Sequence, residues 1–292
     1  MNQVIPASQL VLNNEGAVYH LGLHPEELAE NVILVGDPGR VDMIAAYFDK
    51  IEVKRQNREL WSRTGYYKGT RVTVLSTGMG TDNLDIVMNE LDTLANIYLK
   101  TRTVKDEHKS LNLIRLGTSG ALQEDIPVED SYVATKYAIG LDGLLYFYAK
   151  NREVNEIAIR DAFVEQMNYP KDLPMPYVVE GSNTLLERLG RGFFQGLTAT
   201  APGFYGPQGR TLRMGLAYPE NNRKMEAFHY NGWRICNFEM ESSALYGLGK
   251  MMGHNCLTIC AVIANRVSEQ FCTDYHPYIQ KLVTTTLDRL AE

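Results

Sequence analysis

Residues 32–40 read VILVGDPGR, in which a short apolar run enters a turn rich in glycine, proline and charge. The apolar run predicts a buried strand, and the amphipathic residues that follow the turn predict a helix. The same alternation recurs downstream, with a strand expected at 71–75 and a long helix at about 82–99. This rhythm of strand and helix is typical of an α/β domain.

The rest of the chain continues the alternation. Further strands are expected at 111–116, 131–137, 177–179, 235–238 and 257–264, and further helices near 153–166, 239–252 and 274–290. The hydrophilic stretch TRTVKDEHKS, residues 101–110, is expected to form a surface loop without a chemical role. Because no repeat or long linker divides the chain, we expect one domain over residues 1–292, with 1–17 as an N-terminal extension.

Charge and composition exclude several classes of protein. The 29 Lys and Arg residues are outnumbered by 35 Asp and Glu, and the net charge of −6 disfavours binding to nucleic acid or to an anionic membrane. The N-terminus lacks the features of a signal peptide, and no stretch reaches the roughly 20 apolar residues that span a bilayer. We therefore expect a cytoplasmic protein. The four cysteines form no CxxC pair, so we interpret them as reduced, buried thiols that hold no metal.

Three segments at the ends of predicted strands point to an anion site. Gly36 and Arg40 offer backbone N–H groups and a guanidinium. Arg115 lies inside an apolar strand and precedes a glycine-rich turn expected at 117–120, and the turn STGMG at 76–80 ends another strand. Taken singly, GDPG is a common turn, and Arg115 can equally pair with a structural carboxylate. Because strand-end turns gather on one side of an open α/β sheet, their coincidence favours one composite anion site.

Two further segments carry groups suited to a sugar and a base. Glu239, Met240 and Glu241 lie where a strand is expected to meet a helix, and paired carboxylates with a pliable methionine can hold a ribose. For these residues alone, an acidic helix N-terminus is the simpler interpretation, since negative charge is favourable there. The loop 201–213 combines glycine and proline with aromatic, amide and guanidinium side chains, which solvated connectors rarely need.

Seven short segments follow one another in a distinctive order. They are HLGL at 20–23, GDPGRV at 36–41, STGMG at 76–80, RLGTSG at 115–120, FYGPQGR at 204–210, EMES at 239–242 and NR at 265–266. In this order, from about residue 18 to near the C-terminus, the chain resembles the uridine phosphorylases of the nucleoside phosphorylase superfamily. The resemblance implies a three-layer α/β/α fold around a mixed, barrel-like sheet. It also implies a homodimer, or a hexamer of dimers, whose active sites are shared between subunits.

The resemblance implies a role for each matching residue. The expected ligands of inorganic phosphate, the co-substrate, are Gly36, Arg40, Arg115 and Thr118, with Arg58 donated by the neighbouring subunit. The expected ribose contacts are Glu239, Met240 and Glu241, with His20 reaching the 5′-hydroxyl from the neighbour. The expected base contacts are Phe204, Gln208 and Arg210, with Arg266 ordering the pocket. Catalysis is expected to depend on Arg40, Arg115, Gln208 and Arg210.

The chain departs from related enzymes at two positions. Some hexameric bacterial members hold a monovalent cation through a glutamate and a serine, but here Glu59 is matched by Asn83, which puts such a cation in doubt. No other cofactor is expected. Asn265 stands about where purine phosphorylases carry the aspartate that protonates the base, and this favours a pyrimidine. The arginines disfavour a nucleosidase, and a catalytically silent nucleoside-binding protein is the alternative from another class.

Overall fold

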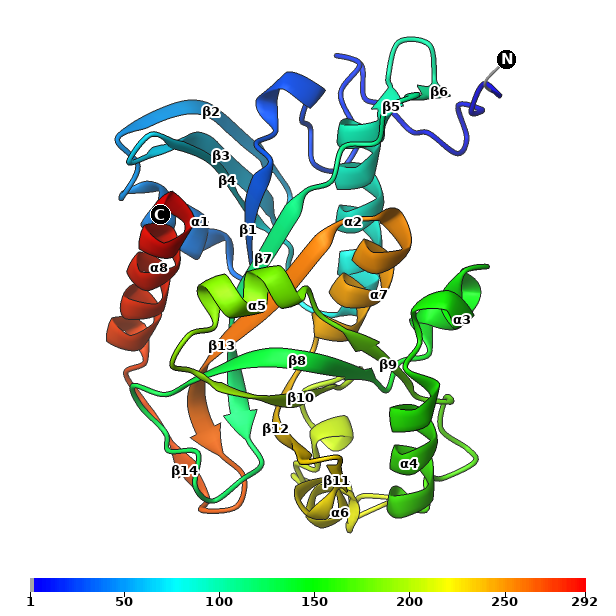
Figure 1. Cartoon of the computed structure of the whole chain (residues 1–292), viewed down its shortest axis with the longest axis vertical. Helices are drawn as coiled ribbons and strands as arrows, with labels where there is room; N and C mark the ends of the chain where they lie inside the picture. Colours follow the sequence, from blue (N-terminus) through cyan, green and yellow to red (C-terminus); the bar gives the residue numbers. More distant parts are fainter. Residues whose placement is uncertain (1–2) are drawn as a thin grey trace.

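A mixed β-sheet forms the framework of the protein in the computed structural model, which describes residues 3–292 (Figure 1). The strands of this sheet are β1 Asn31–Val35, β2 Lys50–Asn57, β3 Leu60–Tyr67, β4 Thr70–Ser76, β7 Asn112–Ala121, β8 Tyr132–Gly140, β9 Tyr177–Glu180, β10 Phe194–Thr200, β11 His229–Tyr230, β12 Trp233–Glu239, β13 Asn255–Asn265 and β14 Gln270–Phe271. Their order is β11-β12-β10-β8-β13-β7-β1-β4-β3-β2, with β14 beside β13 and β9 beside β8.

Strand β7 joins the two halves of this sheet. It pairs in parallel with β1 and β13, and at its far end Ala121 and Gly120 pair with Asn237 and Phe238 of β12. This last pairing closes β7, β13, β8, β10 and β12 into a five-stranded barrel, which confirms the predicted barrel-like sheet. The prediction of a turn at 117–120 was wrong, because these residues belong to β7. The strand continues through these residues because β12 and β13 both pair with its backbone.

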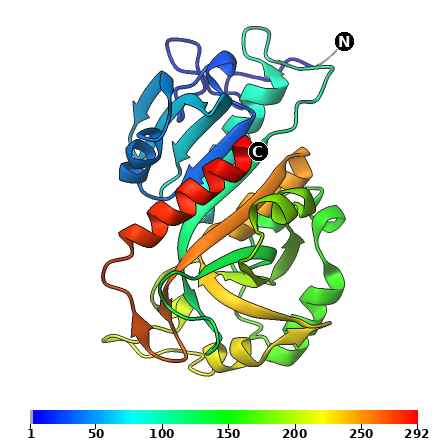
Figure 2. The same cartoon turned by 60° about the vertical axis from the view of Figure 1, so that its left-hand side comes forward.

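Helices cover both faces of the sheet. The helices are α1 Pro38–Ala45, α2 Thr81–Asn96, α3 Asn151–Val154, α4 Ile157–Met167, α5 Asn183–Leu189, α6 Asn221–Ala227, α7 Ser242–Met252 and α8 His276–Ala291, with short 3-10 turns at Pro25–Glu27, Leu144–Phe147 and Gly206–Gln208. Figure 1 shows α8 and α2 on opposite sides of the strands. In Figure 2, α8 lies across the strands. The arrangement confirms the predicted three layers.

Strand β1 shows why the opening apolar run has no polar interruption. Val32 and Leu34 belong to the core beneath α2 and α7, whereas Ile33 and Val35 belong to the core beneath α1, α5 and α8. A strand that is buried on both faces needs apolar residues at every position. The turn at residues 36–40 therefore follows a strand that is packed on both faces.

The helix expected at 153–166 is interrupted. It forms two pieces, α3 and α4, because the backbone between them is bound to the edge strand β9. The Glu156 amide donates to Val178 O (2.7 Å), and Asn155 Oδ1 accepts from the Val178 amide (3.0 Å). These contacts satisfy polar groups of the edge strand β9, and they interrupt the helix between α3 and α4.

The segment 101–110 is more ordered than the plain loop that was expected. Strand β5, Ile97–Tyr98, pairs with β6, Thr103–Val104, in a small hairpin, so α2 ends at Asn96 and does not reach residue 99. The Asn96 side chain accepts from the Lys109 amide at 2.7 Å, which anchors the far end of the segment. The Ile5 amide donates to Arg102 O (2.8 Å), so the N-terminal residues dock on this hairpin.

The longer strands β2, β3 and β10 were not predicted, and neither were the two-residue strands β5, β6, β11 and β14. Strand β2 alternates exposed and partly buried positions, β3 is its partner, and β10 contains Gly196 and several threonines. A search for apolar runs misses such strands. All four cysteines are buried and free, as predicted. Over residues 3–292, no helix combines the length and apolar character needed to cross a bilayer.

Candidate active site

The predicted turns meet around one cavity of about 470 Å³. It opens where the ends of β1, β4 and β12 approach the middle of β7, and the loop 201–213 forms its far wall. The predicted site residues that line it are Gly36, Arg40, Thr118, Arg115, Met240, Glu241, Phe204, Gln208 and Arg210. The structure therefore brings the three expected strand-end segments and both later motifs to one place.

Backbone turns shape the first end of the cavity. Asp37 caps α1 by accepting from the Gly39 amide (2.8 Å), which leaves Arg40 in the first turn of that helix. The Thr77 amide donates to Val35 O (2.8 Å) and holds the two turns side by side. The backbones of the two turns are close, since a Cβ at Gly36 would lie 3.4 Å from Gly78 O. Helix N-terminus and arginine together suit an anion.

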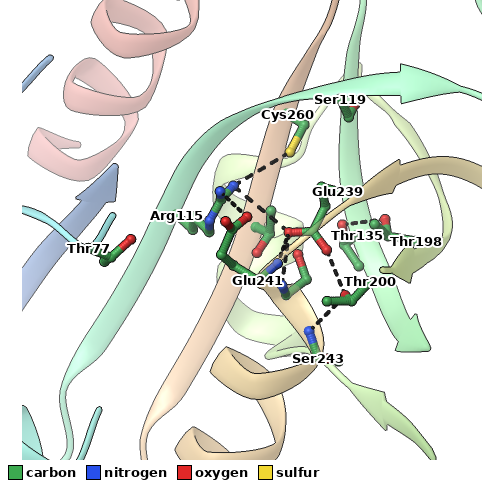
Figure 3. A network of polar contacts seen from close by, with 12 residues as sticks. Thr77, Arg115, Ser119, Thr135, Thr198, Thr200, Glu239, Glu241, Ser243 and Cys260 are labelled. Atoms are coloured by element: carbon green, nitrogen blue, oxygen red, sulfur yellow. Dashed lines mark hydrogen bonds and ion pairs between the residues drawn. The ribbon is translucent and has the colours of Figure 1, made fainter. Parts of the chain in front are cut away.

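Arg115 lines the cavity and lies beside the carboxylates of Glu239 and Glu241 (Figure 3). Its side chain is 6% exposed, donates to Glu241 Oε2 from Nη2, and lies 3.9 Å from Glu239 Oε2 through Nη1. Burial opposes the charged form, but the carboxylates of Glu241 and Glu239 outweigh it and raise the pKa of Arg115. The sequence left open whether Arg115 pairs with an anion or with a carboxylate. Here it has carboxylate partners and still lines the cavity.

The two carboxylates of the EME motif have different surroundings. Glu241 lines the cavity, and its Oε1 accepts from the Gly80 amide at 2.8 Å. Glu239 does not line the cavity: its Oε2 accepts from the Glu241 and Ser242 amides at 2.8 and 2.9 Å, and its Oε1 accepts from Thr200 Oγ1 at 2.6 Å. Burial raises the pKa of Glu239. Glu239 thus caps the start of α7. For this carboxylate, the interpretation as an acidic helix N-terminus applies.

The opposite end of the cavity carries an amide and a guanidinium. Gln208 is buried, and its Oε1 accepts from Arg210 Nη1 at 2.7 Å. Arg210 lies over the Phe204 ring, with Cζ 3.7 Å from the ring centroid. Burial and the nearby Arg266 lower the pKa of Arg210 to about 10. Arg266 is not part of the lining, and it contacts the loop from behind by donating to Gln208 O at 3.4 Å.

Comparison with known proteins agrees with this geometry. Residues 30–290 match the family described as the phosphorylase superfamily. The chain belongs to the phosphorylase superfamily. A uridine phosphorylase of Thermococcus kodakarensis is 33% identical over 88% of this chain and 80% of its own. A DeoD-type purine nucleoside phosphorylase of Brevibacillus brevis is 30% identical over 83% of this chain and 85% of its own. The solved structure of a Trypanosoma brucei nucleoside phosphorylase, described as showing uridine phosphorylase activity, superposes with a TM-score of 0.86 at 32% identity, covering 96% and 99% of the two chains.

Several lining residues of this superfamily member were missed by sequence reasoning. Phe238, Ile263 and Phe271 add apolar surface to the lining. Met79 belongs to the predicted turn 76–80, and it also lines the cavity with 74% of its surface exposed. Ile263 lies on a predicted strand, where alternation could have placed it on an inner face. Phe271 belongs to β14, a two-residue strand that leaves no periodic signal.

Arg58 and His20 lie outside the cavity of their own chain. Arg58 is exposed at the tip of the β2–β3 hairpin with a φ of 51°, and the next residue, Glu59, lines the cavity in its place. Asn57 Nδ2 donates to His20 O at 2.8 Å, so the segments carrying these two residues are neighbours. Glu59 and Asn83, the positions compared with a cation site, both pack beside Gly78.

Asn265 is buried and does not line the cavity. Its Nδ2 donates to Gln123 O and Ile126 O, both at 2.9 Å. Its Oδ1 accepts from the amides of Val267 and Ser268 at 2.8 and 3.0 Å. With both ends of the amide engaged, Asn265 shapes the turn after β13, and it offers neither a proton nor a contact to a base.

A second group of ligand-type side chains lies away from the cavity. The ligand atoms of Asp92, His108 and His254 are all within 4.8 Å of one another. Because His254 Nδ1 accepts from the Leu111 amide (3.2 Å), the neutral ring carries its proton on Nε2, which faces Asp92 Oδ1 at 3.3 Å. His108 Nε2 donates to Met252 O (2.8 Å). The contacts of both rings with the backbone thus anchor the segment around His108.

Proposed function

We propose that this protein is a uridine phosphorylase, a pentosyltransferase that converts uridine and inorganic phosphate into uracil and α-D-ribose 1-phosphate. The observation that carries the proposal is the polarity of the cavity. One end is cationic and suits phosphate, the other holds an amide and a guanidinium that match a uracil edge, and Glu241 lies between them. The similarity to two proteins described by uridine phosphorylase activity supports this choice.

Phosphate is proposed to bind at the end formed by Gly36, Arg40, Arg115 and Thr118. Guanidinium groups bind phosphate oxygens in charge-assisted, paired hydrogen bonds. Arg115 is already held by Glu241, so it can turn a second N–H toward the anion without searching for its orientation. Phosphate then attacks the anomeric carbon from the face opposite the base, which gives the α product.

Glu241 is proposed to hold the ribose. Each of its carboxylate oxygens has one protein donor, Gly80 N or Arg115 Nη2, and keeps further lone pairs for sugar hydroxyls. The transition state resembles an oxocarbenium ion, and the phosphate dianion beside it stabilises that charge. No protein nucleophile is needed.

Gln208 and Arg210 are proposed to bind the base and stabilise the leaving group. Arg210 donates to Gln208 Oε1 and lies beside it at this end of the cavity. When uracil enters, Gln208 can accept from N3–H and donate to one carbonyl, while Arg210 donates to the other carbonyl. These hydrogen bonds strengthen as negative charge reaches the base, so they favour the transition state over the bound substrate.

The choice of uridine over a purine nucleoside follows from the base end. Leaving-group protonation of a purine needs an acid, and the carboxylates among the described lining residues are Asp37, Glu59 and Glu241. None of these belongs to the base loop, and Asn265 is turned away from the cavity.

Incubating the purified protein with uridine, with and without phosphate, tests the proposal. Uracil release is expected to require phosphate and to produce ribose 1-phosphate in equal amount, as followed by chromatography. Inosine and adenosine are the comparison substrates and are expected to react poorly. Equal uracil release without phosphate would indicate a nucleosidase, nucleoside binding without turnover would indicate a silent binding protein, and equal rates on inosine would contradict the base assignment.

A further inference from the structure

One carboxylate fixes both the backbone and the ring of His20. Glu90, on α2, accepts hydrogen bonds from the His20 amide at 2.9 Å, the Leu21 amide at 2.8 Å and His20 Nδ1 at 2.7 Å. The side chain of Glu90 is 14% exposed and that of His20 is 30% exposed. The contact is therefore shielded from water, while the imidazole keeps an open edge.

This contact selects one tautomer of His20. An ionised carboxylate only accepts hydrogen bonds, so Nδ1 carries the ring proton when it binds Glu90. In the neutral ring the lone pair then lies on Nε2, which can accept from a hydroxyl group. The ribose 5′-hydroxyl is such a donor.

Asn57 connects His20 to Arg58. Its Nδ2 donates to His20 O at 2.8 Å and to Tyr19 O at 3.2 Å. Asn57 is the last residue of β2, and Arg58 follows it in the hairpin turn, where Arg58 O accepts from Trp61 Nε1 at 3.0 Å. One amide thus ties the loop that carries His20 to the turn that carries Arg58.

We propose that Glu90 and Asn57 are positioning residues that present His20 and Arg58 as a single unit. Glu90 sets the tautomer of His20, and Asn57 joins the two backbones. The inference rests on the proposed function, in which both side chains enter the site of a neighbouring subunit, His20 at the 5′-hydroxyl and Arg58 at phosphate. Glu90 then governs the use of uridine alone, whereas Asn57 governs uridine and phosphate together.

The first experiment compares Glu90→Gln with the unaltered protein on uridine and on 5′-deoxyuridine. Losing an oriented hydrogen bond of this kind corresponds to about a tenfold change, so the KM for uridine is expected to rise about tenfold. The KM values for 5′-deoxyuridine and phosphate are expected to stay the same, because neither uses His20 Nε2. Glu107→Gln, the same chemical change at an exposed site in the 101–110 segment, is the matched control.

Two measurements separate positioning from general stability. Nitrogen NMR of the His20 ring is expected to show Nδ1–H in the unaltered protein and a mixture of tautomers in Glu90→Gln. Asn57→Ala is expected to raise the KM for both uridine and phosphate severalfold. Equal losses on uridine and 5′-deoxyuridine, or an unchanged tautomer, would overturn the role of Glu90. A phosphate KM unaffected by Asn57→Ala would overturn the coupling. Because the NMR readout needs no turnover, it tests Glu90 even in a protein that fails to cleave uridine.

Discussion

Gly117 leaves room for the Arg115 side chain to lie over the backbone of its own strand, two residues further along. A Cβ at residue 117 would lie 2.0 Å from Arg115 Nη1 and 3.0 Å from Cys260 Sγ, so no side chain fits there without displacing the guanidinium. Cys260 is itself fully buried, and burial raises the pKa of its thiol to about 12, so it contributes a neutral wall. The position of the buried cation thus depends on the absence of one methyl group.

Gly117→Ala is expected to raise the KM for phosphate tenfold or more, because Arg115 loses both its orientation and its contact with Glu241. A tenfold change corresponds to about 1.4 kcal/mol, less than the cost of disrupting a buried ion pair. Steady-state kinetics with varied phosphate measures the effect. Gly215→Ala is the control, since a Cβ there meets open space. An unchanged phosphate KM would place Arg115 outside the phosphate site.

The start of α7 shows how one element serves both fold and site. Glu239 ends β12 and accepts from the first amides of α7, while Glu241, two residues later, reaches the cavity. The cap determines where the helix begins, and the beginning of the helix determines where Glu241 points. A structural carboxylate and a proposed ligand therefore occupy alternate positions of one short motif.

Glu239→Ala is expected to lower the free energy of unfolding by about 2 kcal/mol, since it removes the cap and leaves buried donors unsatisfied. Glu239→Gln is expected to cost less than about 1 kcal/mol, because its amide oxygen can still accept from the two N–H groups. Urea unfolding at fixed protein concentration measures both. Equal destabilisation of the two variants would contradict the capping role, because it would mean that the charge of Glu239 matters more than its hydrogen bonds to α7.

At the scale of the whole molecule, the proposed reaction takes His20 and Arg58 from a neighbouring subunit to complete each cavity. His20 and Arg58 are not among the residues that line the cavity of their own chain, and Asn57 ties the segments that carry them to each other. A symmetric dimer that sets these segments against a partner's cavity would complete two sites at once. The proposed assembly is thus part of the chemistry.

Mixing two inactive variants tests the shared site. Arg58→Ala removes the donated group, and Glu241→Ala removes the ribose ligand of the same chain. In a mixed dimer one site combines an intact Glu241 with an intact Arg58, and the other carries both defects. Random reassortment is expected to restore roughly a quarter of wild-type sites. Mass spectrometry verifies the mixed dimers, and their formation without recovered activity would show that Arg58 acts within its own chain.

The sequence alone was sufficient to predict the features that depend on short, contiguous stretches of residues. The apolar run 32–35 and the glycine-rich turn after it predicted the α/β class. The ordered motifs, through their resemblance to a family, predicted the barrel-like sheet and nine of the residues that line the cavity. These signals are local because a doubly buried strand requires continuous apolar residues, and a turn requires glycine where backbones approach. The interrupted helix, the hairpin at 97–104 and strand β10 left no comparable pattern.

Only the tertiary structure decided which polar groups are free for a ligand. Glu239 was expected to contact the ribose, and Asn265 stands where related enzymes carry an aspartate, yet the two side chains bind the start of α7 and the turn after β13. Residues 117–120 look like a turn, yet two distant strands extend β7 through them. Whether a polar side chain caps a helix or faces a cavity depends on partners far away along the chain, and only folding brings those partners within hydrogen-bond distance.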